Sequence, residues 1–551
     1  MPAVPLAALA QLAGAAYPVD SQPDNSHPDD NHPKDGARLA VGGVSLDSRA
    51  VRTGDLYAAL PGARAHGADF VPAALAAGAV AVLTDPAGAA RIGELRAGPD
   101  AVPVLVVADP RAVLGELAAT VYGHPADELR MVGITGTNGK TTTAYLVDSA
   151  LRALGLSTGL IGTVETRIGQ QRIASVRTTP EAVDLHAILA VMRERGAAAA
   201  VMEVSSHALA QHRVDGVVYD VVLFTNLSQD HLDFHPSMAD YFAAKASLFT
   251  PARARLGVVC VDDEWGARLA ATSGIDVWTV SSGPTPARWR VSTDSWPALR
   301  LRGPDGQLTL HSHLPGTFNV VNTAMAALVL LRLGYAAADV EQAMATEPLV
   351  PGRMQVVPGE PGDPRCVVDY AHTPEAVDAA LAALRPSTPG RLIVVLGAGG
   401  DRDRGKRRAM GAAARRWADD LFVTDDNPRS EDPAAIRAEV VEGTRDVLPW
   451  DADHPHAPGS DCRRTLVTSD AGRAAHIARA VELARAAGSG AGNPADNPTG
   501  NPADNTVVVL GKGHEKGQEI GGIVHPFDDY EALAAALRGQ PYRPEAREGE
   551  R

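Results

Sequence analysis

The sequence predicts an α/β protein of three domains, and three observations support this prediction. The chain has 551 residues, which is enough for about three or four domains that each bury a core. Short apolar runs alternate with helical patterns along most of its length, which is typical of parallel sheets covered by helices. Polar residues collect where these runs end, and open α/β sheets bind their ligands at that edge.

The composition indicates a folded protein without a general affinity for nucleic acids. Hydrophobic residues make up 45% and charged residues 21% of the chain, as in ordinary globular proteins. The 51 basic and 66 acidic residues leave a net charge of −15, so a broad basic surface for nucleic acid is not expected. Cys260, Cys366 and Cys462 form no CxxC pair, which suits a reducing compartment and predicts no structural zinc.

The apolar segments predict neither a membrane span nor a secretory signal. No apolar run is both long enough to cross a bilayer and free of Pro, Gly and Asn. The first 17 residues are apolar but lack the basic start of a signal peptide. We therefore expect a cytoplasmic protein that acts on small molecules and does not insert into a membrane.

The N-terminal part predicts a flexible extension followed by a small α/β domain. Residues 1–39 form the extension, with a short helix or a loose end at its start and a segment rich in Asp, Pro, His and Asn after it. Residues 40–126 form the domain, in which Leu46-Asp-Ser48-Arg49 stands at the end of a predicted strand. That place suits an anionic or hydroxylated ligand. A plain turn capped by Asp47 and Ser48 explains it equally well.

The most informative motif is a glycine loop between a predicted strand and a predicted helix, within residues 131–154. Its pattern is Gly136-x-x-Gly139-Lys140-Thr141, and such a loop aims backbone N–H groups at a phosphate chain. Lys140 would reach the terminal phosphates and the Thr141 hydroxyl would be a Mg²⁺ ligand. Ile134 stands where the longer G-x-x-x-x-G-K-[ST] pattern has its first glycine. A glycine turn with a surface lysine is the alternative.

The central domain is expected to span residues 127–350 and to hold further site residues at its strand ends. Predicted strands cover 199–204, 221–227 and 256–261, and Glu203 and His231 follow the first two of these. We therefore expect both side chains near the magnesium and phosphate region. Lys245 lies on a predicted helix, where a lone lysine is usually solvated. The asparagines near the start of the helix after residue 316 could be simple N-caps.

The third domain, residues 351–551, is expected to be a doubly wound sheet. Predicted strands at 366–369, 392–396, 421–424, 465–468 and 506–510 alternate with helices, and most of them end in polar residues. The glycine loop after Leu396 lacks G-x-G-x-x-G, so a dinucleotide-binding fold is weakly supported. Residues 451–463 and 488–505 are expected to be mobile insertions because of their Asp, Asn and Pro content.

Six motifs follow one another along the chain and resemble those of a known family. They are Thr135-Gly-Thr-Asn-Gly-Lys-Thr-Thr142, Met202-Glu-Val-Ser-Ser-His207, Asn226-Leu-Ser-x-Asp-His-Leu-Asp233, Phe318-Asn-Val-x-Asn322, Asp369-Tyr-Ala-His-Thr-Pro374 and Gly511-Lys-Gly-His-Glu515. In this order they resemble the Mur ligases of peptidoglycan synthesis, which use the shorter phosphate loop. The resemblance runs from Leu46 to Glu515 and so covers nearly the whole chain.

The resemblance implies a UDP-sugar domain, a central P-loop ATPase and a Rossmann-like C-terminal domain for the incoming amino acid. It implies that ATP is held by Gly136, Thr137, Asn138, Gly139, Lys140, Thr141, Thr142, Asn319, Arg353, Asp369 and His372. It implies that the UDP-MurNAc-dipeptide is held by Leu46, Ser48, Ala63, Arg64, Ala65, Thr178, Thr179, Ser205, Gln211 and Arg213. Lys140, Glu203, His231 and Lys245 would be the catalytic group.

The resemblance also changes the interpretation of Lys245. In similar enzymes the matching lysine is carbamylated, which turns a cation into an anion that can ligate or orient Mg²⁺. The implied magnesium residues are Thr141, Glu203, His231 and carbamylated Lys245.

The resemblance further implies a pocket for meso-diaminopimelate, because Asp426-Asn-Pro-Arg429 matches the family's signature for this substrate. A guanidinium can bind the carboxylate at the far end of diaminopimelate, which L-lysine lacks. The pocket would consist of Arg402, Asp426, Asn427, Pro428, Arg429, Gly511 and Glu515. The implied enzyme is expected to be a monomer that uses ATP to join this amine to UDP-MurNAc-L-Ala-D-Glu through an acyl phosphate.

Three alternatives remain at this point. An L-lysine-adding member of the family is disfavoured by Arg429, and a folylpolyglutamate synthetase is disfavoured by the domain that contains residues 46–49. A nucleotide-binding regulator or scaffold would leave the polar strand ends of the third domain unexplained.

Overall fold

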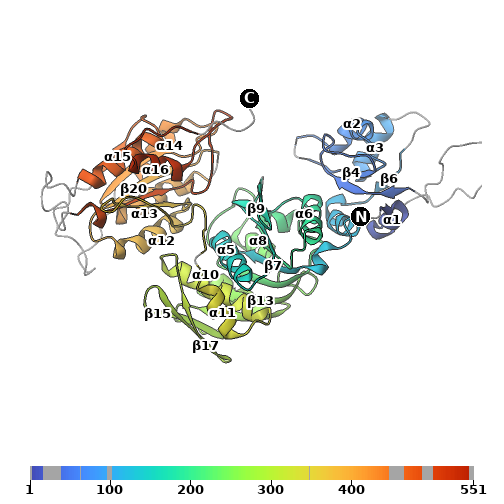
Figure 1. Ribbon diagram of the computed structural model, residues 1–551. Helices are drawn as coiled ribbons and strands as arrows, with labels where there is room; N and C mark the ends of the chain where they lie inside the picture. The colour runs from blue at the N-terminus through green and yellow to red at the C-terminus, as the bar shows by residue number, and fades with distance from the viewer. Residues whose placement is uncertain are drawn as a thin grey trace, which may run out of the picture.

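The computed structural model describes residues 3–15, 39–62, 64–95, 102–175, 177–346, 348–401, 403–445, 465–486 and 501–544. The described chain forms three α/β domains, and the central domain lies between the other two (Figure 1). The three-domain α/β fold expected from the sequence is therefore confirmed. Among the described residues, no helix is long and apolar enough to cross a membrane.

The N-terminal domain is built on a parallel sheet of four strands in the order β3-β4-β5-β6. The strands are β3 (Gly43–Ser45), β4 (Asp55–Ala59), β5 (Ala81–Thr84) and β6 (Val104–Val106), and the helices are α2 (Val71–Ala76), α3 (Pro86–Leu95) and α4 (Pro110–Val121). Strand β4 is buried along its whole length, which explains the apolar run from Leu56 to Ala59 that follows its first residue.

The first residues of the chain differ from the expected flexible extension. Strand β1 (Val4–Pro5) pairs with β2 (Ala40–Val41), and helix α1 (Leu6–Ala13) follows it. Leu6 and Leu9 are 0% exposed and belong to the same hydrophobic core as Val41 and Leu114. Residues 3–15 are thus an integral part of this domain, because their apolar side chains complete its core. The expected mobile segment 18–37 lies outside the described residues.

The central domain contains an eleven-stranded sheet in the order β10-β9-β8-β11-β7-β12-β13-β14-β15-β16-β17. Its strands are β7 (Arg130–Thr135), β8 (Thr158–Ile161), β9 (Glu165–Ile168), β10 (Gln171–Ala174), β11 (Ala199–Glu203), β12 (Tyr219–Phe224), β13 (Ala254–Cys260), β14 (Asp276–Ser281), β15 (Trp289–Ser295), β16 (Ala298–Gly303) and β17 (Gly306–His311). The strands from β8 to β15 in this order are parallel, while the outer strands add antiparallel hairpins.

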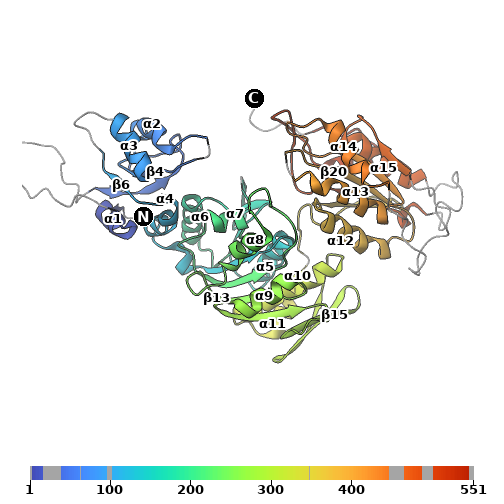
Figure 2. The same cartoon turned by 180° about the vertical axis from the view of Figure 1, so that it is seen from behind.

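Helices cover both faces of the central sheet. They are α5 (Lys140–Ala153), α6 (Ala182–Glu194), α7 (Ser206–Ala210), α8 (Met238–Ala246), α9 (Glu264–Thr272), α10 (Thr317–Arg332) and α11 (Ala337–Met344). Val132 and Ile134 of β7 pack into one core with α5 and α10, and Met131 packs into a second core with α6 and α8. Figure 2 shows the second face, with α6, α8 and α9. The central strand β7 is therefore buried on both sides, and its C-terminal end is held firmly.

The C-terminal domain is doubly wound around six strands in the order β18-β19-β23-β20-β21-β22. The strands are β18 (Gln355–Val357), β19 (Arg365–Asp369), β20 (Leu392–Ala398), β21 (Asp420–Asp425), β22 (Thr465–Thr468) and β23 (Thr506–Leu510), and only β18 is antiparallel. Helices α12 (Pro374–Leu384), α13 (Gly405–Trp417) and α14 (Pro433–Glu442) pack on one face, and α15 (Arg473–Ala486) and α16 (Asp529–Leu537) on the other. A hairpin of β24 (Gln518–Ile520) and β25 (Ile523–His525) stands beside the sheet.

The two expected insertions are only partly described. Residues 451–463 and 488–500 lie outside the described residues, while 501–505 form a short turn that leads into β23.

Candidate active site

The glycine loop connects β7 to α5 and is held by the end of the neighbouring strand β12. The N–H of Thr137 donates to the Asn226 carbonyl at 2.9 Å, and the N–H of Asn138 donates to Asn226 Oδ1 at 2.9 Å. Gly136 has φ +143°, and a Cβ there would collide with the Thr225 hydroxyl. Only glycine therefore fits at this position, and the loop is rigid before any ligand binds.

The loop opens into a cavity of about 620 Å³ that the central and C-terminal domains line together. The predicted residues that line it are Thr137, Asn138, Gly139, Lys140, Thr141, Thr142, Thr178, Glu203, Ser205, His231, Asn319, Arg353, Asp369 and His372. Residues from ends of separate strands thus meet at one place, because the parallel strands all end at the same edge of their sheet.

Lys140, Thr141 and Glu203 form the floor of this cavity. The Lys140 ammonium donates to the carbonyls of Gly136 and Thr137 at 2.9 and 2.7 Å. Burial lowers the pKa of Lys140, and the Glu203 and Asp230 carboxylates act in the opposite direction. Glu203 is 1% exposed, and its Oε2 accepts a hydrogen bond from the Thr141 hydroxyl at 3.0 Å.

Lys245 on α8 is buried against the same loop and is not the solvated lysine that its sequence context suggests. It is 1% exposed, and its ammonium donates to the Gly136 carbonyl at 2.7 Å. The nitrogen also lies 4.7 Å from the centre of the Tyr241 ring. Burial and the nearby Lys140 cation hold the pKa of Lys245 well below its usual value. Both effects favour the neutral amine over the ammonium at this position.

His231 and His372 enter the cavity from the central and C-terminal domains. Burial lowers the pKa of each to about 4, so both rings are neutral near neutral pH. Asp230 stands beside them. Its burial favours the protonated acid, but the positive charges that His231, His372 and Lys406 can carry lower its pKa overall.

Arg353 connects the two domains across the cavity. Its Nη2 donates to the Thr141 hydroxyl at 3.3 Å, and its guanidinium lies 4.2 Å from the centre of the Tyr370 ring. Asp369 accepts hydrogen bonds from the N–H groups of Met354 and Ala371 at 2.7 and 2.8 Å. The segment that follows the central domain is thereby fixed to the end of β19.

Thr178, Thr179 and Ser205 lie beside Glu203, whereas Gln211 and Arg213 contact each other and are linked to the N-terminal domain through Glu181. The Thr179 hydroxyl donates to the Glu203 carbonyl at 2.9 Å and lies 3.3 Å from the Ser205 hydroxyl. Arg213 pairs with Glu181 at 3.0 Å, and Glu181 also pairs with Arg111 of α4 at 3.0 Å. This second group therefore extends from the cavity to the first domain.

The remaining residues predicted for the nucleotide-sugar belong to the N-terminal domain and do not line the cavity. Leu46 and Ser48 follow β3, and Arg64 and Ala65 precede a short helical turn at residues 67–70. Ala63 lies outside the described residues. The structure as described does not bring these positions to the phosphate loop.

The residues predicted for the amino acid form a connected cluster at the C-terminal edge of the third sheet. The Asn427 amide donates to Glu515 Oε2 at 2.8 Å. Arg429 has φ +54°, donates to the Gly400 carbonyl at 2.6 Å and pairs with Glu519 at 3.3 Å. Pro428 lies between these two side chains in the same turn. Arg402 lies outside the described residues.

Gly511 begins the loop that carries Glu515, and it allows a close approach of that loop to Asp426. A Cβ on Gly511 would lie 3.1 Å from Asp426 Oδ2, at a backbone φ of +116°. Tyr370 then links this cluster to the phosphate cavity, because its hydroxyl donates to Glu515 Oε1 at 3.3 Å. The two predicted sites are thus neighbours, joined through Arg353 and Tyr370.

Three further residues in the sites had no role in the sequence prediction. Thr163 donates to Glu203 through its N–H at 2.8 Å and its hydroxyl at 3.0 Å, and no motif marks it. Tyr370 and Lys512 stand inside the Asp369 and Gly511 motifs. In the sequence, the only indication of their role was their position between residues already predicted to belong to the sites.

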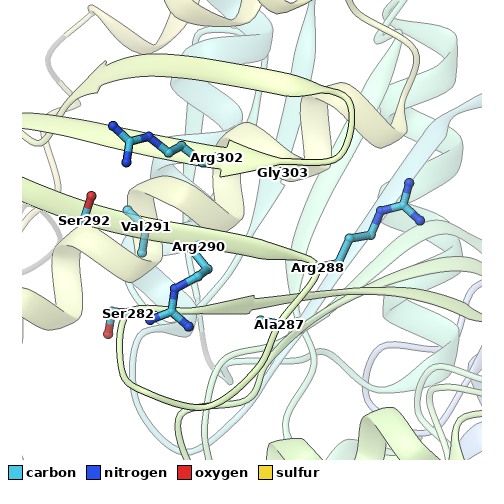
Figure 3. A pocket seen from close by; sticks show the side chains of 8 residues that line it. All are labelled: Ser282, Ala287, Arg288, Arg290, Val291, Ser292, Arg302 and Gly303. Atoms are coloured by element: carbon cyan, nitrogen blue, oxygen red, sulfur yellow. The ribbon is translucent and has the colours of Figure 1, made fainter.

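A second hollow lies on the outer part of the central domain and is lined by residues of β15, of β16 and of the connection between β14 and β15 (Figure 3). Its arginines already have partners in the chain. Arg290 donates to the Thr285 carbonyl at 3.1 Å, Arg302 to Gln307 at 2.9 Å, and Arg288 pairs with Asp305 at 3.1 Å. We therefore assign no ligand to this hollow.

The oxygen donors of the cavity fit a magnesium ion better than a transition metal. The described residues contain no group of three or more His, Cys, Asp or Glu side chains that could hold a metal ion. Glu203 instead stands with the hydroxyls of Thr141 and Thr163 at 3.0 Å. One carboxylate with hydroxyls, completed by water and phosphate oxygens, is a usual environment for Mg²⁺.

Comparison with protein families assigns most of the chain between residues 40 and 489. The model described as "Mur ligase family, catalytic domain" matches residues 40–122, "Mur ligase middle domain" matches 134–330, and "Mur ligase, glutamate ligase domain" matches 352–489.

Curated relatives agree with these matches. The UDP-N-acetylmuramoyl-L-alanyl-D-glutamate--2,6-diaminopimelate ligase of Streptomyces coelicolor is 50% identical over 545 residues, covering 97% of both chains. The ligase of the same name from Xylella fastidiosa is 40% identical over 509 residues, covering 91% of this chain and 94% of that protein.

Solved structures show the same architecture. A structure of UDP-N-acetylmuramoyl-L-alanyl-D-glutamate--2,6-diaminopimelate ligase has a TM-score of 0.61 at 28% identity, covering 92% of this chain and 96% of that one. A ligase from Thermotoga maritima in complex with ADP shares the fold, with a TM-score of 0.58 at 18% identity over 90% and 97% of the two chains. The phosphate loop, the cavity between two domains and these matches together place the chain in the Mur ligase family.

Proposed function

We propose that this chain is the ATP-dependent ligase that joins meso-diaminopimelate to UDP-N-acetylmuramoyl-L-alanyl-D-glutamate in peptidoglycan precursor synthesis. The observation that carries the proposal is the shared cavity, in which the phosphate loop faces Arg353, Asp369 and His372 of the C-terminal part. Relatives that bear this ligase name along nearly the whole chain support it. A cavity between domains suits the reaction, since closure keeps water from a reactive intermediate.

The reaction needs activation because a carboxylate is a poor acyl donor. The side-chain carboxylate of D-glutamate attacks the γ-phosphorus of ATP, ADP leaves, and an acyl phosphate forms. The diaminopimelate amine then attacks the acyl carbon, and the tetrahedral intermediate expels phosphate and loses a proton to give the amide. The chain itself contributes charge and positioning, and it needs no nucleophilic side chain.

ATP is held mainly by the loop and by groups that surround its open side. The backbone N–H groups at the start of α5, from Gly139 to Thr142, and the Lys140 ammonium bind the phosphates. Asn319 at the start of α10, together with Arg353, Asp369 and His372, positions the nucleotide from the opposite wall of the cavity. Lys140 stabilises the negative charge that moves during transfer of the phosphoryl group.

Magnesium is the cofactor that this donor set supports. Thr141, Glu203 and His231 would hold it, with phosphate oxygens and water as further ligands. When bound, the ion supplies positive charge beside the γ-phosphate. The same chain residues also order the site without it, since Glu203 fixes the hydroxyls of Thr141 and Thr163.

Lys245 is the proposed site of carbamylation. Its lowered pKa favours the neutral amine, which is the form that attacks CO₂. The new N–C bond gives a carbamate, and the amine releases one proton. The resulting anion lies within reach of Lys140 and of the magnesium residues, so it replaces a repulsive pair of cations with an attractive pair. Removal of CO₂ and bicarbonate should lower the rate of phosphate release about tenfold, and added bicarbonate should restore it. A Lys245→Met variant should not respond to bicarbonate.

The nucleotide-sugar substrate approaches from the N-terminal domain. Leu46, Ser48 and the turn Ala63-Arg64-Ala65 would bind the UDP-sugar. Thr178, Thr179, Ser205, Gln211 and Arg213 would bind the lactoyl-dipeptide. The contacts of Thr179 and Ser205 next to Glu203 support this assignment, because the D-glutamate carboxylate must reach the γ-phosphate.

Arg429 is proposed to bind the far carboxylate of diaminopimelate. The rest of the pocket would consist of Arg402, Asp426, Asn427, Pro428, Gly511 and Glu515. The Arg429 guanidinium is already oriented by Gly400 and Glu519, and Glu515 accepts the far ammonium group. A ligase for L-lysine would have no use for this guanidinium.

We also propose a first domain of residues 40–126 together with residues 3–15, further domains at 127–350 and 351–551, and a cytoplasmic monomer. The three separate sheets support the limits. Two buried free cysteines, Cys260 and Cys366, suit a reducing compartment. Light scattering of the purified chain tests the oligomeric state.

The deciding experiment measures phosphate release from ATP with UDP-MurNAc-L-Ala-D-Glu and either meso-diaminopimelate or L-lysine. We expect release that requires all three substrates, with diaminopimelate preferred by at least about a hundredfold in kcat/KM. Equal use of L-lysine would favour the lysine-adding alternative. Binding of ATP without any amine-dependent release would overturn the proposal.

A further inference from the structure

Lys512 is a completely buried lysine at the edge of the proposed amino-acid pocket. It follows β23 directly and is 0% exposed. Its ammonium lies 2.9 Å from Asn427 Oδ1, 3.3 Å from Asp426 Oδ1 and 3.3 Å from Glu515 Oε2. An ammonium has three N–H donors, so each donor has one of these three partners.

All three partners belong to the cluster proposed to bind the substrate amine. A buried ion pair contributes little to stability when its desolvation is counted. A lysine that only held the fold together would be expected to contact residues of the core. The Lys512 ammonium instead bonds to the Asp426-Asn427 turn after β21 and to Glu515 in its own loop after β23. Its position therefore relates to the pocket more than to the packing of the sheet.

Lys512 determines how Asn427 and Glu515 are oriented. Asn427 presents its carbonyl oxygen to the ammonium and to the N–H of Glu519 at 3.0 Å, so its NH₂ group must face Glu515 Oε2, at 2.8 Å. Oε2 thus receives both Lys512 and Asn427, and Oε1 receives the Tyr370 hydroxyl at 3.3 Å. Three contacts, from Lys512, Asn427 and Tyr370, hold this carboxylate in one position, ready for one more donor.

Lys512 also determines the charge of the pocket. Asp426 and Glu515 are two carboxylates close together, and Lys512 neutralises one of them. Arg429 and Glu519 form a neutral pair beside them. The described groups that contact one another here therefore carry one net negative charge. The far end of diaminopimelate has an ammonium and a carboxylate and is neutral, whereas the far end of L-lysine is a cation.

We propose that Lys512 is a positioning residue that sets specificity for the amine substrate: it orients Glu515 and Asn427 and lowers the negative charge of the pocket, so that a neutral zwitterionic end is preferred over a cationic one. This inference rests on the proposed function. It assigns to Lys512 a role that Arg429 alone does not fill, because Arg429 recognises the carboxylate and Lys512 limits the attraction for a bare ammonium.

The test compares the full-length wild-type chain with Lys512→Met, which keeps the length of the side chain and removes its charge. We expect the KM for meso-diaminopimelate to rise about 10- to 100-fold, with the KM for ATP and for the UDP-dipeptide within about twofold of wild type. The ratio of kcat/KM for L-lysine to that for diaminopimelate should rise at least about tenfold. An unchanged ratio, or an equal loss for every substrate, would overturn the inference.

A second variant keeps the test decisive if Lys512→Met folds poorly. Lys512→Met with Asp426→Asn removes one charge of each sign and leaves no additional buried carboxylate unpaired. The double variant should return toward the wild-type preference for diaminopimelate. If it folds, as judged by its thermal midpoint and by ATP binding, yet prefers L-lysine or shows no preference, the charge argument is wrong.

A control variant distinguishes the general effect of losing a buried cation from the specific effect of losing Lys512. Arg391 pairs with Asp420 at 2.6 Å at the opposite end of the same sheet. Arg391→Met should lower the thermal midpoint without changing the KM for either amine. Wild-type activity separates this inference from the proposed function: if the wild-type chain does not use diaminopimelate, both are wrong, and if it does while Lys512→Met behaves like wild type, only the inference is wrong.

Discussion

The phosphate cavity and the amino-acid pocket hold their buried cations in opposite ways. In the cavity, Lys140 and Lys245 both donate to the Gly136 carbonyl. The positive charge of Lys140 therefore disfavours a positive charge on Lys245. In the pocket, Lys512 and Arg429 stand against the carboxylates of Asp426, Glu515 and Glu519. The first region is prepared for an incoming polyanion, and the second for a zwitterion.

This difference shows how two neighbouring regions can divide the work: the cavity serves phosphoryl transfer, and the pocket selects the amine substrate. A buried positive charge without an anionic partner costs free energy until a ligand supplies the partner. The phosphates of ATP supply it, so ATP binding lowers the free energy of these buried charges. A pocket whose cations already have carboxylate partners gains little from any single ion. It discriminates by geometry and by small differences in net charge.

The largest effect is expected for Lys140→Ala, which removes the cation nearest to the transferred phosphoryl group. Phosphate release should fall at least about a thousandfold, because electrostatic stabilisation of the transition state is lost. Initial rates with all three substrates measure this loss. Activity within about tenfold of wild type would show that the cavity does not depend on its unpaired cations.

Arg429→Met should have the next largest effect and should be confined to the amine. We expect kcat/KM for meso-diaminopimelate to fall by an amount that corresponds to a loss of about 2–4 kcal/mol of transition-state stabilisation. The KM for ATP should stay within about twofold of wild type. Competition between diaminopimelate and L-lysine in one reaction measures the change in preference. A comparable rise in the KM for ATP would mean that the two regions do not act separately.

His186 provides a titrating group that belongs to neither region. It is 0% exposed on α6, and burial lowers its pKa from 6.5 to about 4. Unfolding lets this ring take up a proton, so its contribution to stability is complete above about pH 6.5 and is lost as the pH falls toward 4. The loss is at most about 3 kcal/mol. Urea unfolding at about pH 7 and about pH 4.5 should show a smaller drop for His186→Gln than for wild type. An equal drop would assign acid sensitivity to other groups, including those of the cavity.

The smallest effect is expected for Arg479→Ala, which serves as a surface control. Arg479 pairs with Glu482 on α15 at 3.1 Å, with both side chains 66% exposed. Exposed pairs of this spacing contribute about 0.5 kcal/mol or less. Neither the thermal midpoint nor any KM should change measurably. A change in the KM for diaminopimelate would show that the pocket responds to distant surface charge.

Local patterns predicted the elements that place the sites. The apolar run at residues 131–135, the glycines after it and the helical spacing beyond it correspond to β7, the loop and α5. The strand ends at Glu203 and His231 line the cavity as expected, because parallel strands end at one edge. The apolar helix at residues 6–13 shows what composition does not predict. A short apolar segment can be a helix or a loose end, and only the packing of Leu6 and Leu9 into the domain core decides between the two.

The sequence by itself determined the phosphate loop, the alternation of strands and helices, and the family, because these follow from local conformational preference and from motif order. Only the tertiary structure decided the environment of single charges. Lys245 meets the Gly136 carbonyl across 109 positions and Arg353 meets Thr141 across 212. Such contacts depend on how whole sheets and domains pack, and the burial that lowers the pKa of Lys245 and of His372 exists only once that packing has formed.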